Sequence, residues 1–206
     1  MYLKHVPPFL LTGLALLTGS TLALPELATN RRAWRIPAAT LALGVYGLFG
    51  FHFLLFIALR NVPPVEANLV NDLWPLLMVL LAPVLLRGLK LRALHVAAAL
   101  MGFTGAAIAI LGDGCAAGGG GWSWGYVPAL ASAFIWASCS LATQRVKASP
   151  TAVIGLFGLV SGLLSLLCHW ALEPQAELSS RDWLLILVMG LGPLGTRPSS
   201  VVRAET

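Results

Sequence analysis

Charged side chains are scarce in this sequence. Asp, Glu, Lys and Arg make up only 10% of its 206 residues, whereas 58% of the residues are hydrophobic. A typical soluble domain carries about 25% charged residues, which cover the surface that faces water. The scarcity of charge excludes an ordinary soluble enzyme and a disordered chain. We therefore expect a protein that crosses a lipid bilayer several times.

Cysteine and histidine are also few. The three cysteines form no disulfide framework, because Cys139 and Cys168 lie in apolar segments and Cys115 lies in a glycine-rich stretch. Three of the four histidines lie in three different apolar segments, so no pair of them has the helical spacing of metal ligands. We expect neither a metal site nor a cofactor. The net charge of +5 does not indicate nucleic-acid binding, because the basic residues lie between apolar segments.

Long apolar segments, in contrast, fill most of the chain. A spanning helix needs about 20 mostly apolar residues, and closely spaced spans in lipid must be helical. The sequence predicts spans at residues 6–24, 36–59, 62–86, 93–111, 122–143, 151–172 and 183–194. The last is about half the length required. The prediction is an all-α polytopic membrane protein with six full spans and part of a seventh, in which Asn61 caps the third span and residues 112–121 form a linker.

Basic residues are distributed unevenly between the loops. Ten of the 13 Lys and Arg residues follow the first, third, fifth and seventh segments. Because positive residues stay in the cytoplasm, we expect these loops inside, the N-terminus of this chain outside, and the protein in the inner (plasma) membrane. The alternative for residues 6–24, a cleaved signal peptide, would place the first Arg-rich loop on the wrong side. The simplest explanation of an outer N-terminus is a further span upstream of Met1.

Two parts of the chain resemble each other. Thr12-Gly13-Leu14 matches Phe157-Gly158-Leu159, and each of these segments ends in a Pro/Glu turn. The loops that follow carry opposite charge bias, as an inverted-topology repeat of five helices requires. We expect an incomplete first repeat at residues 1–111, a glycine-rich extracytoplasmic linker at 112–121, an incomplete second repeat at 122–195, and an atypical polar tail at 196–206.

Three stretches resemble one transporter family. They are residues 66–77 (EANLVNDLWPLL), residues 102–113 (GFTGAAIAILGD), and residues 129–137 (ALASAFIWA) with Arg145. The chain resembles a drug/metabolite transporter superfamily protein of the EamA type, a family with ten spans in two inverted five-helix halves. Within it, the blocks around Trp74 and Trp136 are similar to the aromatic amino acid exporter branch.

The resemblance implies an exporter that moves a small metabolite by alternating access. An amino acid is the expected substrate, and an aromatic one if the branch likeness holds. Exporters of this branch tend to carry an aromatic residue where this chain has Asp72. Set against the ten spans of this family, we expect the first span and spans nine and ten to have no counterpart in the 206 residues. The alternatives are therefore a non-functional truncated fragment, or a chain completed by a homodimer or by another protein that supplies the missing helices.

The third segment carries the candidate substrate site. Asp72 lies about 15 Å along the axis of this helix, close to the middle of the bilayer, where an ionisable side chain is costly and is by default a functional candidate. Asn68, Asn71, Asp72 and Pro75 fall within an arc of about 100°. Pro75 removes a hydrogen bond to the Asn71 carbonyl and should kink the helix. The other interpretation is that Asp72 only joins helices within the bundle.

Other polar and aromatic residues leave alternatives open. Glu66 either gates the site, binds a cation, or is solvated at the helix end. Trp74 and Trp136 either stack on a substrate or face lipid. His52 and His169 are either proton carriers or hydrogen-bonded interior residues.

An intramembrane enzyme is not expected. The chain has no Gly-x-Ser-x-Gly motif and no second aspartate at the depth of Asp72. Gly158-xxx-Gly162 and the glycines at 44, 47 and 50 are typical of close helix packing.

Overall fold

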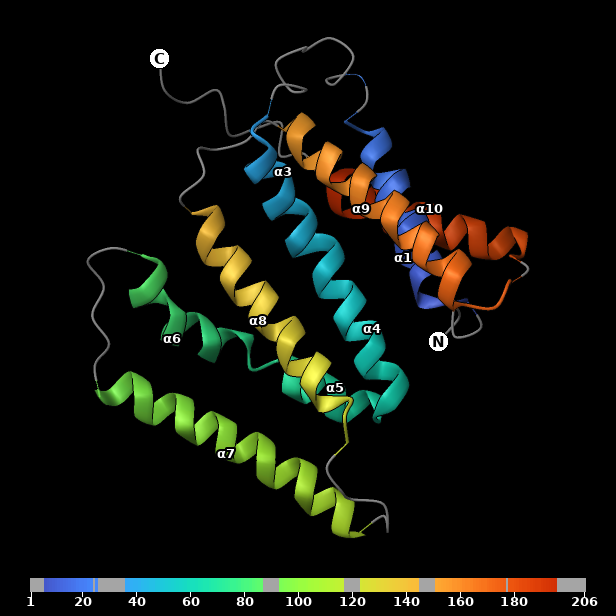
Figure 1. The fold of residues 1–206 in the computed structure, drawn as a ribbon. Helices are drawn as coiled ribbons and strands as arrows, with labels where there is room; N and C mark the ends of the chain where they lie inside the picture. The colour runs from blue at the N-terminus through green and yellow to red at the C-terminus, as the bar shows by residue number, and fades with distance from the viewer. Residues whose placement is uncertain are drawn as a thin grey trace. The chain divides into compact units, whose positions relative to one another are not determined.

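A computed structural model describes residues 6–23, 25, 36–86, 93–116, 123–144, 151–176 and 178–195. Figure 1 shows that the regular structure in these ranges is helical, which confirms the expected all-α class. The elements are α1 (Pro8–Thr21), α3 (Ala38–Val45), η2 (Tyr46–Gly50), α4 (Phe51–Asn61), α5 (Pro64–Asn71), α6 (Trp74–Leu85), α7 (Ala93–Ala116), α8 (Tyr126–Thr143), α9 (Thr151–Leu172) and α10 (Ser180–Gly195).

Within the described residues, four helical runs are long and apolar enough to cross a membrane. They are Ala38–Asn61, Pro64–Leu85, Tyr126–Thr143 and Val153–Leu172. All four lie where the sequence predicts spans. Two shorter apolar stretches, Pro8–Thr21 and Ala93–Gly105, lie in the predicted spans at 6–24 and 93–111.

Two helix ends differ here from the prediction. The Asn61 side-chain amide donates to the Ile57 carbonyl of its own helix (2.7 Å). The residue directly before α5 is Pro63, which makes no side-chain capping hydrogen bond, so the prediction that Asn61 caps the third span is wrong. Helix α7 continues to Ala116, five residues into the expected linker, and residues 117–121 lie outside the described residues. The tail at 196–206 and the basic stretches at 26–35, 87–92 and 145–150 also lie outside them.

The seventh segment is longer than expected because α10 begins at Ser180. Ser179 precedes the helix, and its backbone N–H donates to the Asp182 carboxylate (2.9 Å). In return the Asp182 N–H donates to the Ser179 hydroxyl (3.3 Å). This reciprocal pair is a capping box, which starts the helix three residues before the apolar run that begins at Trp183.

The chain forms two compact units, residues 38–148 and residues 1–37 with 149–206. This grouping follows packing contacts and does not test the predicted repeats at residues 1–111 and 122–195, which stay a prediction. In the first of these units α8 is the central helix: it packs on α3, η2 and α4, and on α5 and α6. Helix α7 packs on α6 and α5 (Figure 1).

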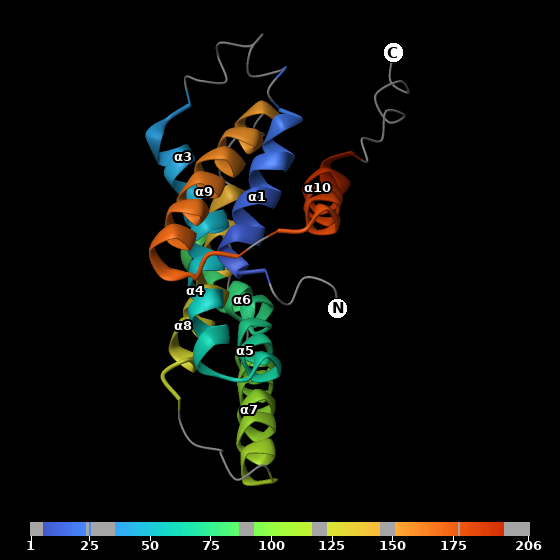
Figure 2. The same ribbon diagram turned by 90° about the vertical axis from the view of Figure 1, so that its right-hand side faces the viewer.

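In the other unit, α1 lies along α9, and α10 packs on α1 (Figure 2). Helices α1 and α9 run antiparallel, since Gly13 lies against Leu166 and Gly155 lies against Ala23. A Cβ on Gly162 would lie 2.9 Å from the Leu17 Cγ, and one on Gly158 would lie 2.6 Å from the Ser20 hydroxyl. The prediction that Gly158-xxx-Gly162 allows close helix approach is confirmed. Gly13 and Gly158, matched in the sequence repeat, each face the other's helix.

Candidate functional site

The third predicted span is interrupted near its middle. Helix α5 ends at Asn71, Asp72 and Leu73 form a turn, and α6 begins at Trp74. Pro75 lies in the first turn of α6, where its missing N–H is harmless, and it has no N–H to offer the Asn71 carbonyl. The Asp72 N–H donates to the Asn68 carbonyl (2.8 Å), and the Leu73 N–H donates to the Val70 carbonyl (3.2 Å). The expected kink is therefore a two-residue turn between α5 and α6, at which Asp72 and Leu73 keep right-handed helical backbone angles.

The polar residues of this span do not share one environment. Asn71 is buried, and its Oδ1 accepts a hydrogen bond from the Ser132 hydroxyl of α8 (2.9 Å). Asn68 is exposed and donates to the Pro64 carbonyl in its own helix (2.8 Å). Asp72 and Pro75 are also exposed in the isolated chain. Asn71 thus ties α5 to α8, whereas Asp72 lies open at the break.

Glu66 is held at the start of α5 by a residue that sequence analysis missed. The Tyr126 hydroxyl, at the start of α8, donates a short hydrogen bond to the Glu66 carboxylate. Nearby, the Ser123 hydroxyl donates to the Asn61 carbonyl (3.2 Å). These contacts join the adjacent ends of α4, α5 and α8. The gating role of Glu66 stays a prediction.

The two tryptophans singled out in the sequence lie together. The rings of Trp74 on α6 and Trp136 on α8 are 6.5 Å apart between centroids in an edge-to-face arrangement. Phe51 of α4 adds a third ring, 5.1 Å from Trp136. We call Phe51, Trp74 and Trp136 the aromatic cluster. The sequence offered no sign of Phe51 because its position depends on how α4 packs against α8.

A π-helical turn, η2, lies directly before Phe51. Here the small residues allow close contact, because a Cβ on Gly47 would overlap the Cys139 thiol of α8 and one on Gly50 would lie 3.2 Å from Ile135. The Tyr46 and Ser138 hydroxyls are hydrogen-bonded (3.0 Å). Single π-turns inside α-helices are frequent at functional sites. The interruption in this span and the break before α6 both adjoin α8.

Both interior histidines are hydrogen-bonded. The His52 Nδ1 lies 2.6 Å from the Leu48 carbonyl oxygen, and the ring packs on Phe51 and Phe56. The His169 Nδ1 lies 2.9 Å from the Glu173 carboxylate. Both residues are therefore hydrogen-bonded, and the alternative that they carry protons stays a prediction.

Comparison with known proteins identifies the family. The profile of the EamA-like transporter family matches residues 1–111. The chain belongs to this family. The aromatic amino acid exporter YddG of Ancylobacter novellus is 40% identical to this EamA protein over an alignment of 201 residues, which covers 92% of this chain and 67% of that exporter. A solved crystal structure is 42% identical, with a TM-score of 0.73 over 93% of this chain and 67% of its own.

Family membership gives the broken helix its context. The EamA chain is a multi-pass membrane protein and a transporter. Its substrate is therefore a small solute, and its apolar spans lie in a lipid bilayer. Transporters often build substrate sites from discontinuous helices, and the break at Asp72 and Leu73 is such a feature.

Proposed function

We propose that this chain exports an amino acid, including aromatic ones, across the inner membrane by alternating access and without covalent chemistry. The observation that carries the proposal is the interruption between α5 and α6 beside the aromatic cluster. The similarity to an aromatic amino acid exporter supports the substrate class.

The break offers complementary groups to the two charges of an amino acid. The C-terminal end of α5 carries partial negative charge, the Asp72 carboxylate adds a full one, and the Asn71 carbonyl has no N–H partner at Pro75. These acceptors suit an ammonium group. The first turn of α6 carries partial positive charge, which suits a carboxylate. We propose Asn68, Asn71, Asp72 and Pro75 as the part of the site that recognises the backbone of the substrate.

The aromatic cluster suits the substrate side chain. Aromatic rings attract each other in edge-to-face and offset arrangements beyond the simple burial of area. Trp136 is 37% exposed, so part of its ring remains available for contact. We propose that Trp74 and Trp136 bind an aromatic side chain, with Phe51 supporting Trp136.

The direction of transport follows from the predicted topology. With the basic loops in the cytoplasm, the first residues of α5 and α8 lie at the extracytoplasmic end. We propose that the Glu66–Tyr126 contact closes that end and opens when the substrate leaves.

The test is the conservative substitution Asp72→Asn, measured as efflux of labelled phenylalanine from cells that contain the full transporter. We expect efflux to be lost and membrane insertion to be unchanged, because only the charge that faces the ammonium group is removed. Thr104→Ala is the matched control: the Thr104 hydroxyl is exposed on α7 and donates to the Leu100 carbonyl of its own helix (2.7 Å). Normal efflux by the Asp72→Asn protein would contradict the site assignment.

A further inference from the structure

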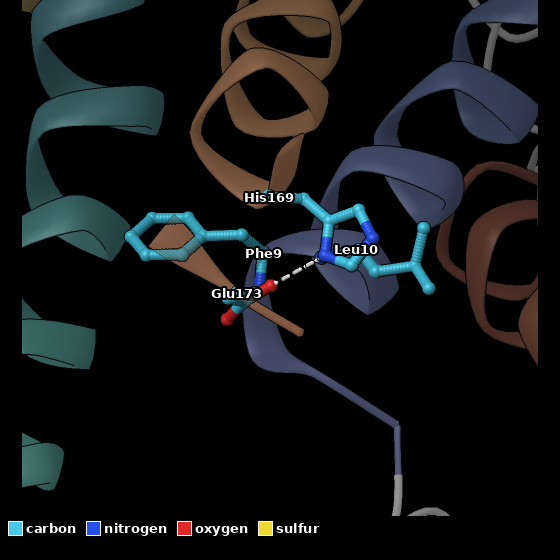
Figure 3. Close-up of polar contacts among 4 residues, drawn as sticks. All are labelled: Phe9, Leu10, His169 and Glu173. Carbon is cyan, nitrogen blue, oxygen red and sulfur yellow. Dashed lines mark hydrogen bonds and ion pairs between the residues drawn. The ribbon is translucent and has the colours of Figure 1, made fainter. Parts of the chain in front are cut away.

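A carboxylate outside the proposed substrate site joins α1 to α9. Glu173 directly follows α9, and its side chain is 1% exposed. Its Oε1 accepts a hydrogen bond from the Phe9 N–H (3.1 Å), and its Oε2 accepts one from the Leu10 N–H (3.3 Å). The same Oε2 lies 2.9 Å from the His169 Nδ1. Figure 3 shows these four residues converging at the start of α1.

Glu173 supplies what α1 lacks in its own sequence. The first N–H groups of a helix have no partner within the helix. Pro7 caps α1 without a side-chain hydrogen bond, Pro8 has no N–H, and the first turn of α1 has no acidic residue. The Glu173 carboxylate satisfies the next two N–H groups and complements the positive end of the helix dipole. The end of α9 therefore caps the start of α1.

This arrangement depends on the charge of the carboxylate. An ionised carboxylate only accepts hydrogen bonds, whereas a protonated one carries an O–H donor on one oxygen. Because Oε1 and Oε2 both accept hydrogen bonds from N–H groups, a proton on either oxygen weakens that oxygen as an acceptor and adds an O–H that needs a partner of its own. The imidazole of His169 can carry the neighbouring proton. We propose that Glu173 and His169 form a proton-binding site, and that occupancy of this site controls the attachment of α1 to the end of α9.

Few other titratable groups lie on the elements packed here. The described part of α1 carries none. Besides His169, α9 carries Cys168, which is partly buried. The start of α10 carries Arg181 and Asp182, and the Asp182 carboxylate accepts hydrogen bonds from the Ser179 N–H (2.9 Å) and hydroxyl (2.8 Å). Glu173 is thus the described carboxylate that bonds to α1.

The site lies at one end of the contact between α1 and α9. Elsewhere along this contact, Gly13, Gly158 and Gly162 let the two antiparallel helices approach closely. The Glu173 contact adds a polar attachment to this apolar packing, at the start of α1. Any consequence for the transport cycle rests on the proposed function, but the attachment itself does not.

Hydrogen exchange of the full chain in lipid nanodiscs, without substrate, tests the proposal. The readout is the exchange rate of the peptide that contains Phe9 and Leu10 across a pH series, corrected for intrinsic exchange. We expect protection at neutral pH and an acid step of about tenfold, the size expected for loss of a side-chain cap. Glu173→Gln keeps an acceptor oxygen that does not titrate, so the step should disappear.

His169→Gln and Thr104→Ala complete the design. His169→Gln keeps the carboxylate but removes the imidazole whose Nδ1 lies 2.9 Å from Oε2, so the position of the step should change. Thr104→Ala removes an exposed hydroxyl in the other unit and should leave the step unchanged. The proposal is overturned if the original protein shows no step, if Glu173→Gln keeps it, or if His169→Gln leaves its midpoint in place. Should Glu173→Gln fail to insert, the midpoint in His169→Gln decides. Because no transport is measured, loss of export activity has no influence on these outcomes.

Discussion

The contact between α1 and α9 allows a quantitative test at Gly162. A Cβ there would lie 2.9 Å from the Leu17 Cγ, 3.1 Å from its Cδ2 and 3.1 Å from the Gly13 carbonyl oxygen. Carbon atoms pack best at about 3.5–4.0 Å, so Gly162→Ala forces both a side chain and a backbone to move. We expect a loss of about 1–3 kcal/mol in the free energy of unfolding, as for other overpacked interiors.

A double-mutant cycle separates the two contacts. In a Leu17→Ala background the Cγ and Cδ2 are gone, so Gly162→Ala should cost less than in the original protein, although the Gly13 carbonyl still opposes it. The measurement is unfolding in detergent, followed by tryptophan fluorescence. Gly105→Ala is the control, because nothing lies within 4 Å of a Cβ at that position and alanine favours helix by up to about 1 kcal/mol over glycine. The packing argument fails if Gly162→Ala is as stable as Gly105→Ala, or if the Leu17 background makes no difference to its cost.

Two further substitutions test the unit that contains the broken helix. Ser132→Ala leaves the buried Asn71 oxygen without its hydroxyl donor and should lower the free energy of unfolding by about 1 kcal/mol; an unchanged value in the same fluorescence assay would show that the bond contributes nothing. Trp136→Ala should weaken binding of phenylalanine relative to leucine by about 0.5–1.5 kcal/mol, a factor of about 2 to 12. Competition between the two amino acids in an efflux assay measures that ratio, and an equal loss for both would contradict the stacking role.

Features set by covalent structure were predictable from the sequence. Proline lacks an N–H wherever it lies, so Pro75 identified the interruption in the third span. The apolar lengths likewise identified the four long spans. The start of α10 was missed because apolar periodicity begins at Trp183, whereas the capping box of Ser179 and Asp182 that starts the helix is polar.

Features set by contacts between distant residues were not predictable. Ser132 lies 61 positions from Asn71, and Glu173 lies 164 positions from Phe9. No local pattern reports such pairings, which exist only once the helices have packed. For Asn61 the sequence predicted a contact that does not form: its side chain is of a type that caps helices, but it bonds to the Ile57 carbonyl of its own helix. Asn71 and Asp72 are adjacent in the sequence but differ in burial, because only Asn71 faces α8.

The uninterrupted course of α8 has a mechanical consequence. Its 18 residues form one α-helix between two spans that each contain a local departure from α-helical structure, one at the π-turn and the other at Asp72 and Leu73. The helices on both sides of each departure pack against α8, so both spans share one supporting surface. Bulky substitutions along α8 should therefore disturb both the π-turn and the turn at Asp72 and Leu73, whereas substitutions within either neighbouring span should disturb only one of them.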